Sequence, residues 1–170
     1  MTRYVAFLRG VTPQNAKMPS LKACFEGAGF DRVKTILGSG NVAFDTRAAS
    51  IESLARRAQD ALQKELGRTF ATIVRSSDYL RDLVASNPFA RFDVPPEAKR
   101  VVTFLRRPPG NVTLPTGRDG AVILGTAGCE AFTAYVPGDK GPVFMVLLER
   151  TFGTDITTRT LDTVARCAVA

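Results

Sequence analysis

Histidine is absent from the 170 residues of this chain, and this absence removes several kinds of chemistry. It excludes Ser-His-Asp and Cys-His catalysis, histidine general bases and the usual zinc sites. The sequence also has no P-loop, no GxGxxG motif and no DxD pair. We therefore expect neither a metal nor a cofactor. Any catalysis would depend on carboxylates, lysine, arginine, tyrosine or cysteine, and the sequence leaves enzyme activity open.

Cysteines are few, and long apolar runs are missing. The three cysteines are Cys24, Cys129 and Cys167; their odd number and their spacing do not indicate a disulfide framework. Cys24 lies one helical turn from Leu21 and is interpreted as a core residue. No apolar stretch approaches the ~18 residues that span a membrane, and the N-terminal residues do not resemble a signal peptide. We expect a soluble, cytoplasmic protein without a membrane partner.

Charge is the most unusual feature of the composition. Lysine and arginine outnumber aspartate and glutamate by 23 to 16, which gives a formal net charge of +7. A basic excess favours polyanionic partners. However, the basic residues are scattered and none forms a run of five or more. Two interpretations remain: solvated surface charge, or a dispersed set of anion contacts.

The first half of the chain has the clearer periodicity. Apolar residues at Leu54, Ala58 and Leu62 follow the helical period, Ser50 can cap this helix, and Gly67 can end it. The predicted strands are 3–8, 33–37, 41–44 and 70–74, and the predicted helices are 19–28 and 51–66. This β-α-β-β-α-β order is the ferredoxin-like, split βαβ arrangement. We expect residues 1–76 to form a four-stranded antiparallel sheet with both helices on one face.

The second half, 77–170, is harder to interpret. A helix is predicted over 78–85, a strand over 101–105, and a hairpin from strands 121–124 and 130–136. The segment 143–152 fits a strand or a helix by pattern alone, although Glu149, Arg150 and Gly153 favour a helix end. Thr158 is predicted to cap a last helix. We expect an α+β fold of two ferredoxin-like (α/β-plait) subdomains with antiparallel sheets, divided at residue 76.

Three short motifs are the candidate site. They are Leu8-Arg9-Gly10, Ser39-Gly40-Asn41 and Thr157-Thr158-Arg159, and each lies where a regular element is predicted to begin or end. Such places present backbone N–H groups, and two of the motifs add a guanidinium group, which suits an anion. Lys17 precedes a predicted helix start and would add a further cation. We expect these residues to gather around one groove.

Each motif also has a structural explanation. Arg9 can form an ion pair with an acid such as Asp155. Ser39-Gly40-Asn41 can be a hairpin turn in which glycine and asparagine supply positive φ. Capping explains one of the threonines before Arg159, but an arginine at the positive end of a helix dipole is disfavoured. That conflict favours an anionic partner for Arg159, either internal or external.

Taken together, these residues resemble a known family. The segments that carry the resemblance are 7–11, 17–21, 29–35, 39–44, 87–89, 103–105 and 157–164. The chain resembles the bacterial domain of unknown function 1697 over nearly its whole length. The resemblance implies two α/β-plait subdomains in one chain and no established reaction.

The sequence predicts a binding module for a phosphate-bearing ligand, which would be a nucleotide, another small molecule or a nucleic acid. The candidate ligand-binding residues are Arg9, Gly10, Lys17, Ser39, Gly40, Asn41, Thr158 and Arg159. Two alternatives remain open: a small hydrolase or transferase that works without histidine, and a protein-interaction module without catalysis. The sequence does not indicate an oligomeric state.

Overall fold

A computed structural model describes all 170 residues, and the chain divides into two compact units. The first unit comprises Met1–Asp82 together with Ala165–Ala170, and the second comprises Leu83–Val164. Each unit is built on a four-stranded antiparallel sheet. The fold is therefore α+β with two ferredoxin-like subdomains, as the sequence predicts.

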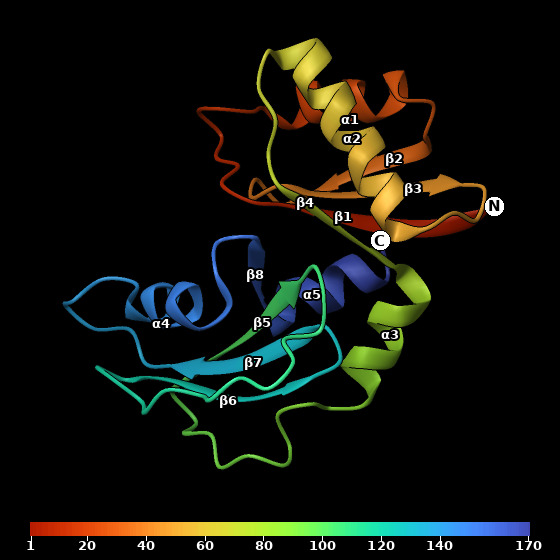
Figure 1. Ribbon diagram of the computed structural model, residues 1–170. Coiled ribbons are helices and arrows are strands. Elements are labelled where there is room, and N and C mark those ends of the chain that lie inside the picture. Colours follow the sequence, from red (N-terminus) through yellow and green to blue (C-terminus); the bar gives the residue numbers. More distant parts are fainter. The chain divides into compact units, whose positions relative to one another are not determined.

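The first unit follows the β-α-β-β-α-β plan (Figure 1). Its elements are β1 (Thr2–Leu8), α1 (Met18–Gly27), β2 (Asp31–Ile36), β3 (Asn41–Thr46), α2 (Ile51–Leu66) and β4 (Thr72–Ser76), and α3 (Ser77–Ala85) begins in it. The strand order is β2-β3-β1-β4. Both α1 and α2 cover the same face of this sheet, so the predicted arrangement is confirmed. The fourth strand lies two residues later than predicted.

Helix α2 shows why the local prediction succeeds. Ser50 precedes it in an extended conformation, and its hydroxyl accepts a hydrogen bond from the Ser53 N–H at 3.2 Å. Gly67 ends the helix in the left-handed conformation, at φ 69°, which glycine adopts without steric cost. The stripe that includes Leu54 and Leu62 is buried against the sheet. The N-cap, the apolar stripe and the terminal glycine therefore all predict the same helix.

Aromatic rings fill the core between the helices and the sheet of the first unit. The ring of Phe44 on β3 lies 4.2 Å from that of Phe30, 5.6 Å from that of Phe25 on α1 and 5.9 Å from that of Tyr4 on β1, centroid to centroid. The two longer separations are typical of favourable ring pairs, and the Phe30–Phe44 pair is closer still. The Arg57 guanidinium covers the Phe30 ring at 4.4 Å. This cluster fixes α1 and α2 on β1 and β3.

The second unit repeats the strand order with fewer helices. Its elements are the end of α3, β5 (Lys99–Leu105), β6 (Ala121–Ala127), β7 (Glu130–Tyr135), α4 (Val143–Phe152), β8 (Ile156–Thr160) and the start of α5 (Leu161–Ala168). The order β6-β7-β5-β8 matches that of the first sheet, strand for strand. However, no helix lies between β5 and β6, where residues 106–120 are irregular. The segment 143–152, left open by the sequence, is a helix.

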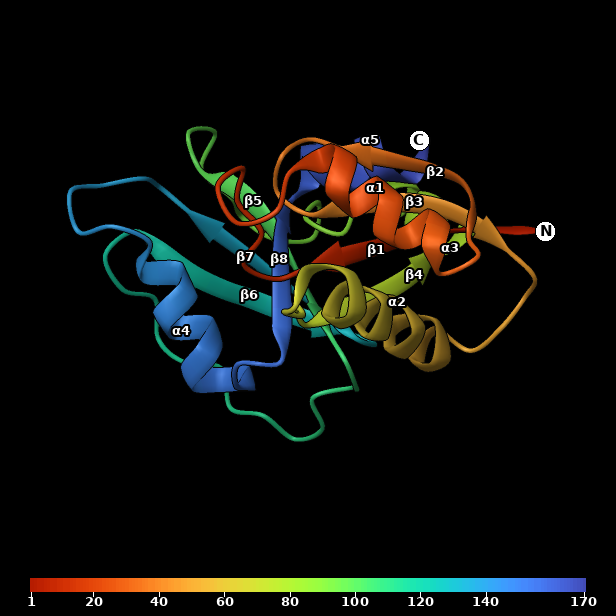
Figure 2. The ribbon, with the colours of Figure 1, turned by 90° about the horizontal axis from the view of Figure 1, so that it is seen from above.

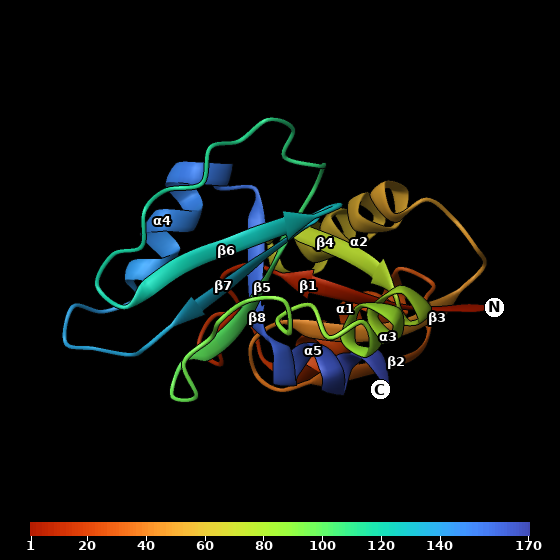
Figure 3. The same cartoon turned by 90° about the horizontal axis from the view of Figure 1, so that it is seen from below.

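Helix α4 packs beside β6 (Figures 2 and 3). The Phe144 ring stacks on Tyr135 of β7 with 4.3 Å between centroids. Leu148 of α4 and Ile156 of β8 are almost completely buried in the same cluster. Leu147 is buried with Leu148, whereas Val146 is 46% exposed, so the sheet covers only part of the apolar run of α4.

One predicted helix start is wrong. Thr157, Thr158 and Arg159 lie in β8, where Thr158 pairs with Thr103 of β5. The cap of α5 is Thr160, whose hydroxyl accepts a hydrogen bond from the Thr163 N–H at 3.3 Å. Threonine suits both a strand and a cap, and pairing with β5 decides between them. The argument from a cation at a helix start therefore does not hold for Arg159.

Candidate functional site

The loop after β1 and the β2–β3 turn pack against each other in the first unit. The Leu8 N–H donates to the Gly40 carbonyl at 2.8 Å. Gly40 has φ +86°, and a Cβ atom there would lie 2.9 Å from the Val11 Cβ and 3.0 Å from the Leu8 carbonyl oxygen. These contacts leave no room for a side chain. Gly40 is therefore required by the local packing, whatever else it does.

Asn41 closes the same turn from inside. Its side chain is buried, and the amide nitrogen donates to the Ile36 carbonyl at 2.8 Å and to the Ser39 hydroxyl at 3.1 Å. Leu37 takes a positive φ of 60° in the turn. Ser39 is exposed. The prediction that glycine and asparagine both supply positive φ is therefore right for Gly40 and wrong for Asn41, which is the first residue of β3. The asparagine acts through its buried side chain, and Ser39 lies at the surface.

Asn15 holds the loop that carries Gly10. Its amide nitrogen donates to the Gly10 carbonyl at 2.8 Å, and its amide oxygen accepts from the Thr12 N–H at 2.8 Å. The Thr12 hydroxyl in turn accepts from the Asn15 N–H at 3.3 Å. Asn15 is not among the predicted site residues, although asparagine is a frequent turn residue because its side chain bonds nearby backbone groups. The loop is thereby ordered up to α1.

Lys17 lies at the N-cap of α1. No side chain accepts a hydrogen bond from the first turn of this helix, and no acidic residue lies in that turn. By contrast, α2 has a serine cap and Glu52 in its first turn. A helix N-terminus carries partial positive charge, so a lysine there adds like charge. The side chain is exposed, and this end of α1 is positively charged without an internal acid to offset it.

Arg9 follows β1 directly and is partly exposed. Its backbone N–H donates to the Ala71 carbonyl at 2.9 Å, which continues the pairing of β1 with the chain before β4. The structure thus brings Arg9 and Gly10, at the end of β1, next to the turn of Ser39, Gly40 and Asn41. Lys17 ends the same loop.

The third motif belongs to the second unit. Arg159 donates from its guanidinium group to the Thr157 hydroxyl at 2.8 Å and to the Thr158 carbonyl at 2.7 Å. Thr158 points to the opposite face of the strand, toward α4, where its hydroxyl lies 3.6 Å from the Met145 sulfur. Thr158 and Arg159 therefore face different sides of one sheet. That they share a groove with Arg9 and Lys17 stays a prediction.

A pocket of about 240 Å³ lies at the start of β8 in the second unit. Asp155 lines it and forms a two-pronged ion pair with Arg106, at 2.7 Å from Nε and 2.9 Å from Nη2. Arg107 also lines the pocket and is exposed. From the sequence, Arg106 and Arg107 could not be distinguished from any other exposed basic pair. The acid that contacts Arg106 lies 49 residues away, too far for a local pattern to indicate the ion pair.

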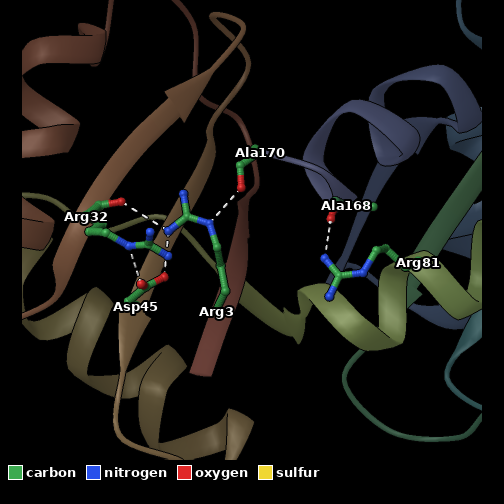
Figure 4. A network of polar contacts seen from close by, with 6 residues as sticks. All are labelled: Arg3, Arg32, Asp45, Arg81, Ala168 and Ala170. Atoms are coloured by element: carbon green, nitrogen blue, oxygen red, sulfur yellow. Dashed lines mark hydrogen bonds and ion pairs between the residues drawn. The ribbon is translucent and has the colours of Figure 1, made fainter. Parts of the chain in front are cut away.

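The best defined ionic network lies elsewhere in the first unit (Figure 4). Asp45 accepts from Arg3 at 2.6 Å and from Arg32 at 2.5 Å. Burial alone would raise the pKa of the Asp45 carboxyl, but the hydrogen bonds and charges of Arg32 and Arg3 outweigh it, and the pKa is lowered. The hydrogen bond and charge of Asp45 raise the pKa of Arg32. A carboxylate held ionised in this way is suited to structure and unsuited to general-acid catalysis.

The same network ties down residues 165–170. Arg3 Nε donates to the Ala170 main-chain oxygen at 2.7 Å, and Arg81 Nη1 donates to the Ala168 carbonyl at 3.2 Å. Both bonds lie within the first unit and are drawn in Figure 4. No local sequence signal could have identified them, because the Arg3 contact joins residues 167 positions apart.

The structure contains no cluster of three or more possible metal ligands, and no helix is both long and apolar enough to cross a bilayer.

Comparisons with known proteins show a family and a fold. The chain superposes on a conserved bacterial protein from Streptococcus pneumoniae with a TM-score of 0.71 and 16% sequence identity, over 99% of this chain and 97% of the other. No curated protein matches. The family model of a protein of unknown function, DUF1697, matches residues 1–118, and the chain belongs to that family.

Proposed function

We propose that the chain is a binding module for a phosphate-bearing ligand, a nucleotide or a nucleic acid, with Arg9, Lys17 and Ser39 as its contacts in the first unit. The observation that carries the proposal is the start of α1. There a lysine occupies the N-cap, no side chain caps the helix, and no acid offsets the positive charge. An anion bound there would accept from exposed N–H groups and from the ammonium group together.

Two further features support this proposal. The loop that leads to Lys17 is ordered by Asn15, so its backbone groups are held in place before any ligand arrives. The net charge of +7 would attract a polyanion to the surface and speed association. Gly10, Gly40 and Asn41 then shape the loops. Arg159 is proposed as a further contact, whereas Thr158 faces α4 on the other side of its strand.

An interaction module without catalysis is the second candidate. It is favoured by the internal hydrogen bonds of Asn41 and Arg159 and by the tight packing around Gly40, which give these residues structural roles. The hydrolase or transferase alternative has no comparable support, since Asp45 is held ionised between two arginines. The two remaining candidates differ in one measurable property: the binding module binds phosphate-bearing anions, and the interaction module does not.

The experiment uses the full chain and two variants with the same change in charge. Lys17→Gln removes the cation at the start of α1. Lys34→Gln removes an exposed cation on β2 and is the matched control. Binding of ATP and of a fluorescent single-stranded oligonucleotide is measured by anisotropy at several salt concentrations.

We expect Lys17→Gln to weaken binding at low salt and to reduce the salt slope by about one for the oligonucleotide, whereas Lys34→Gln changes both less. Equal effects of the two variants would indicate nonspecific charge and contradict the assigned site. If the parent protein binds neither probe at low salt, the interaction module becomes the better candidate.

A further inference from the structure

The second unit contains a pocket that the motifs do not include. It has a volume of about 400 Å³ and lies between the turn before β6 and the first turns of α4. Arg118, Lys140 and Arg150 line it, together with the single acid Asp119. A volume of this size accommodates a small organic molecule.

The charges in this pocket do not balance. The Asp119 carboxylate contacts both Arg118 Nε and Lys140 Nζ, at 3.3 Å each. One carboxylate therefore serves two cations, and Arg150 has neither an ion pair nor a side-chain hydrogen bond. The pocket keeps a formal excess of two positive charges. Repulsion between these cations falls when an anion enters.

One wall of the pocket is apolar. Val143, Val146 and Arg150 lie on the same face of α4, because their spacing of three and four residues follows the helical turn. Val146 is 46% exposed, so the pocket combines unburied apolar surface with cations. Inorganic phosphate would satisfy the charge but leave this wall in water. A ligand with both an anionic and an apolar part would use both.

We propose that this pocket binds a phosphate monoester with an apolar organic group. The phosphate lies among Arg118, Lys140 and Arg150, and the organic part lies against Val143 and Val146. A monoester carries nearly two negative charges above its second pKa of about 6, which matches the excess charge of the pocket. The site is separate from Arg9, Lys17 and Ser39, and it does not depend on the function proposed for them.

The probe is phenyl phosphate, compared with inorganic phosphate and with phenol by isothermal titration calorimetry. We expect phenyl phosphate to bind most tightly, since only it contacts both the cations and the apolar wall. We also expect its affinity to fall as the pH is lowered through about 6, where the ester becomes a monoanion. If inorganic phosphate binds as tightly as the ester, the apolar wall does not contribute and the proposal is wrong.

Two variants should change the affinity for phenyl phosphate in opposite directions. Asp119→Asn removes the competing carboxylate and should tighten binding of phenyl phosphate about three- to fivefold, the contribution of one exposed charge. Asparagine suits the positive φ of 49° at this position, so the turn is preserved. Arg150→Gln removes the cation that has no ion pair and should weaken binding by a similar factor.

Two further variants keep this result apart from the first site. Lys34→Gln removes one positive charge elsewhere and should leave binding of phenyl phosphate within about twofold, the difference expected from long-range charge alone. Lys17→Gln measures how much of the ester binds at the first site, whereas Arg150→Gln and Asp119→Asn report on this pocket. Loss of binding in Lys17→Gln with no change in Arg150→Gln and Asp119→Asn would move the ester to the first site and overturn this proposal. Absence of binding by the parent protein would overturn it as well.

Discussion

The two sheets of this protein have the same strand order but differ in what covers them. In the first unit two helices cover one face, and the rings of Tyr4 and Phe44 fill the space beneath them. In the second unit α4 alone packs beside β6, and the corresponding face carries Thr103 and Thr133. Strand pairing therefore sets this topology, while the helices that cover the sheet can differ.

Two buried threonines distinguish the sheet of the second unit. Thr103 and Thr133 are completely buried, and neither hydroxyl has a hydrogen-bond partner. A buried hydroxyl without a partner costs roughly 1–3 kcal/mol. The first unit buries the hydroxyl of Thr72 too, but there it donates to the Phe70 carbonyl at 2.9 Å. The buried Ser77 hydroxyl, in the first unit, has no partner either, so the difference between the units lies in their sheets: two hydroxyls without a partner in the second, against the bonded Thr72 in the first.

The largest expected effect comes from the aromatic core. Phe25→Ala should lower the free energy of unfolding by roughly 3–5 kcal/mol, because the ring is fully buried and contacts both Phe30 and Phe44. Urea denaturation followed by circular dichroism measures the change. Val146→Ala, at a half-exposed position, is the control and should lower the free energy of unfolding by no more than about 1 kcal/mol. A loss below about 1 kcal/mol for Phe25→Ala would contradict the packing described for the first unit.

The next effect concerns pH and Asp45. Its pKa is lowered in the folded state, so the stability it contributes is present above the pKa that the carboxyl has in the unfolded chain, about 3.9. This contribution is lost as the pH falls through the lower, folded-state pKa. Asp45→Asn should cost roughly 1–3 kcal/mol at neutral pH, because Arg3 and Arg32 lose their partner.

The check is a series of urea denaturations between neutral and acid pH. The parent protein should lose stability in acid more steeply than Asp45→Asn, and the two curves should converge at the lowest pH. Parallel curves would mean that the Asp45 carboxyl has the same pKa folded and unfolded.

A smaller effect of opposite sign is expected in the second unit. Thr103→Val and Thr133→Val each replace a hydroxyl that has no partner with a methyl group of similar size, and should raise the free energy of unfolding by about 1 kcal/mol. Thr72→Val is the matched control in the first unit and should destabilise, since it removes a made hydrogen bond. Destabilisation by all three variants would indicate that the hydroxyls of Thr103 and Thr133 are as well satisfied as that of Thr72.

The smallest effect tests whether the two units act on one ligand. If Arg9 and Arg159 contact the same anion, their substitutions by alanine should not be additive in the binding free energy. The expected coupling in a double-mutant cycle is about 0.5–1 kcal/mol. Melting temperatures of the same variants show whether folding is affected. Additive losses of binding would place Arg9 and Arg159 at separate contacts.

Local signals in the sequence predicted the elements whose boundaries are chemically marked. Ser50 and Gly67 bound α2 at the predicted residues, and the periodicity gave the β-α-β-β-α-β succession of the first unit. Thr158 was assigned to a helix start because threonine serves caps and strands alike, and only pairing with β5 distinguishes them. The segment 143–152 stayed open for a similar reason, since a buried apolar run fits both structures.

The candidate site could be predicted only in part. Sequence placed Lys17 before a helix, and that helix begins one residue later. It did not show that the Asn41 amide donates to the Ile36 carbonyl within the β2–β3 turn. Nor did it show that Asn15 holds the loop after β1 through the Gly10 carbonyl. The bond from Arg3 to Ala170 and the pocket around Asp119 join segments far apart in the chain, and no local pattern reports such contacts.

The bond between Arg3 and the Ala170 main-chain oxygen has a consequence for how the chain is made. The first unit is discontinuous: residues 165–170 complete it, yet the ribosome adds them after the whole second unit. Closing the intervening 82-residue loop is entropically costly if that stretch is unfolded. A nascent chain should therefore form the second unit before Arg3 and Arg81 find their last acceptors. Protease resistance of the first unit would then rise in two stages during synthesis.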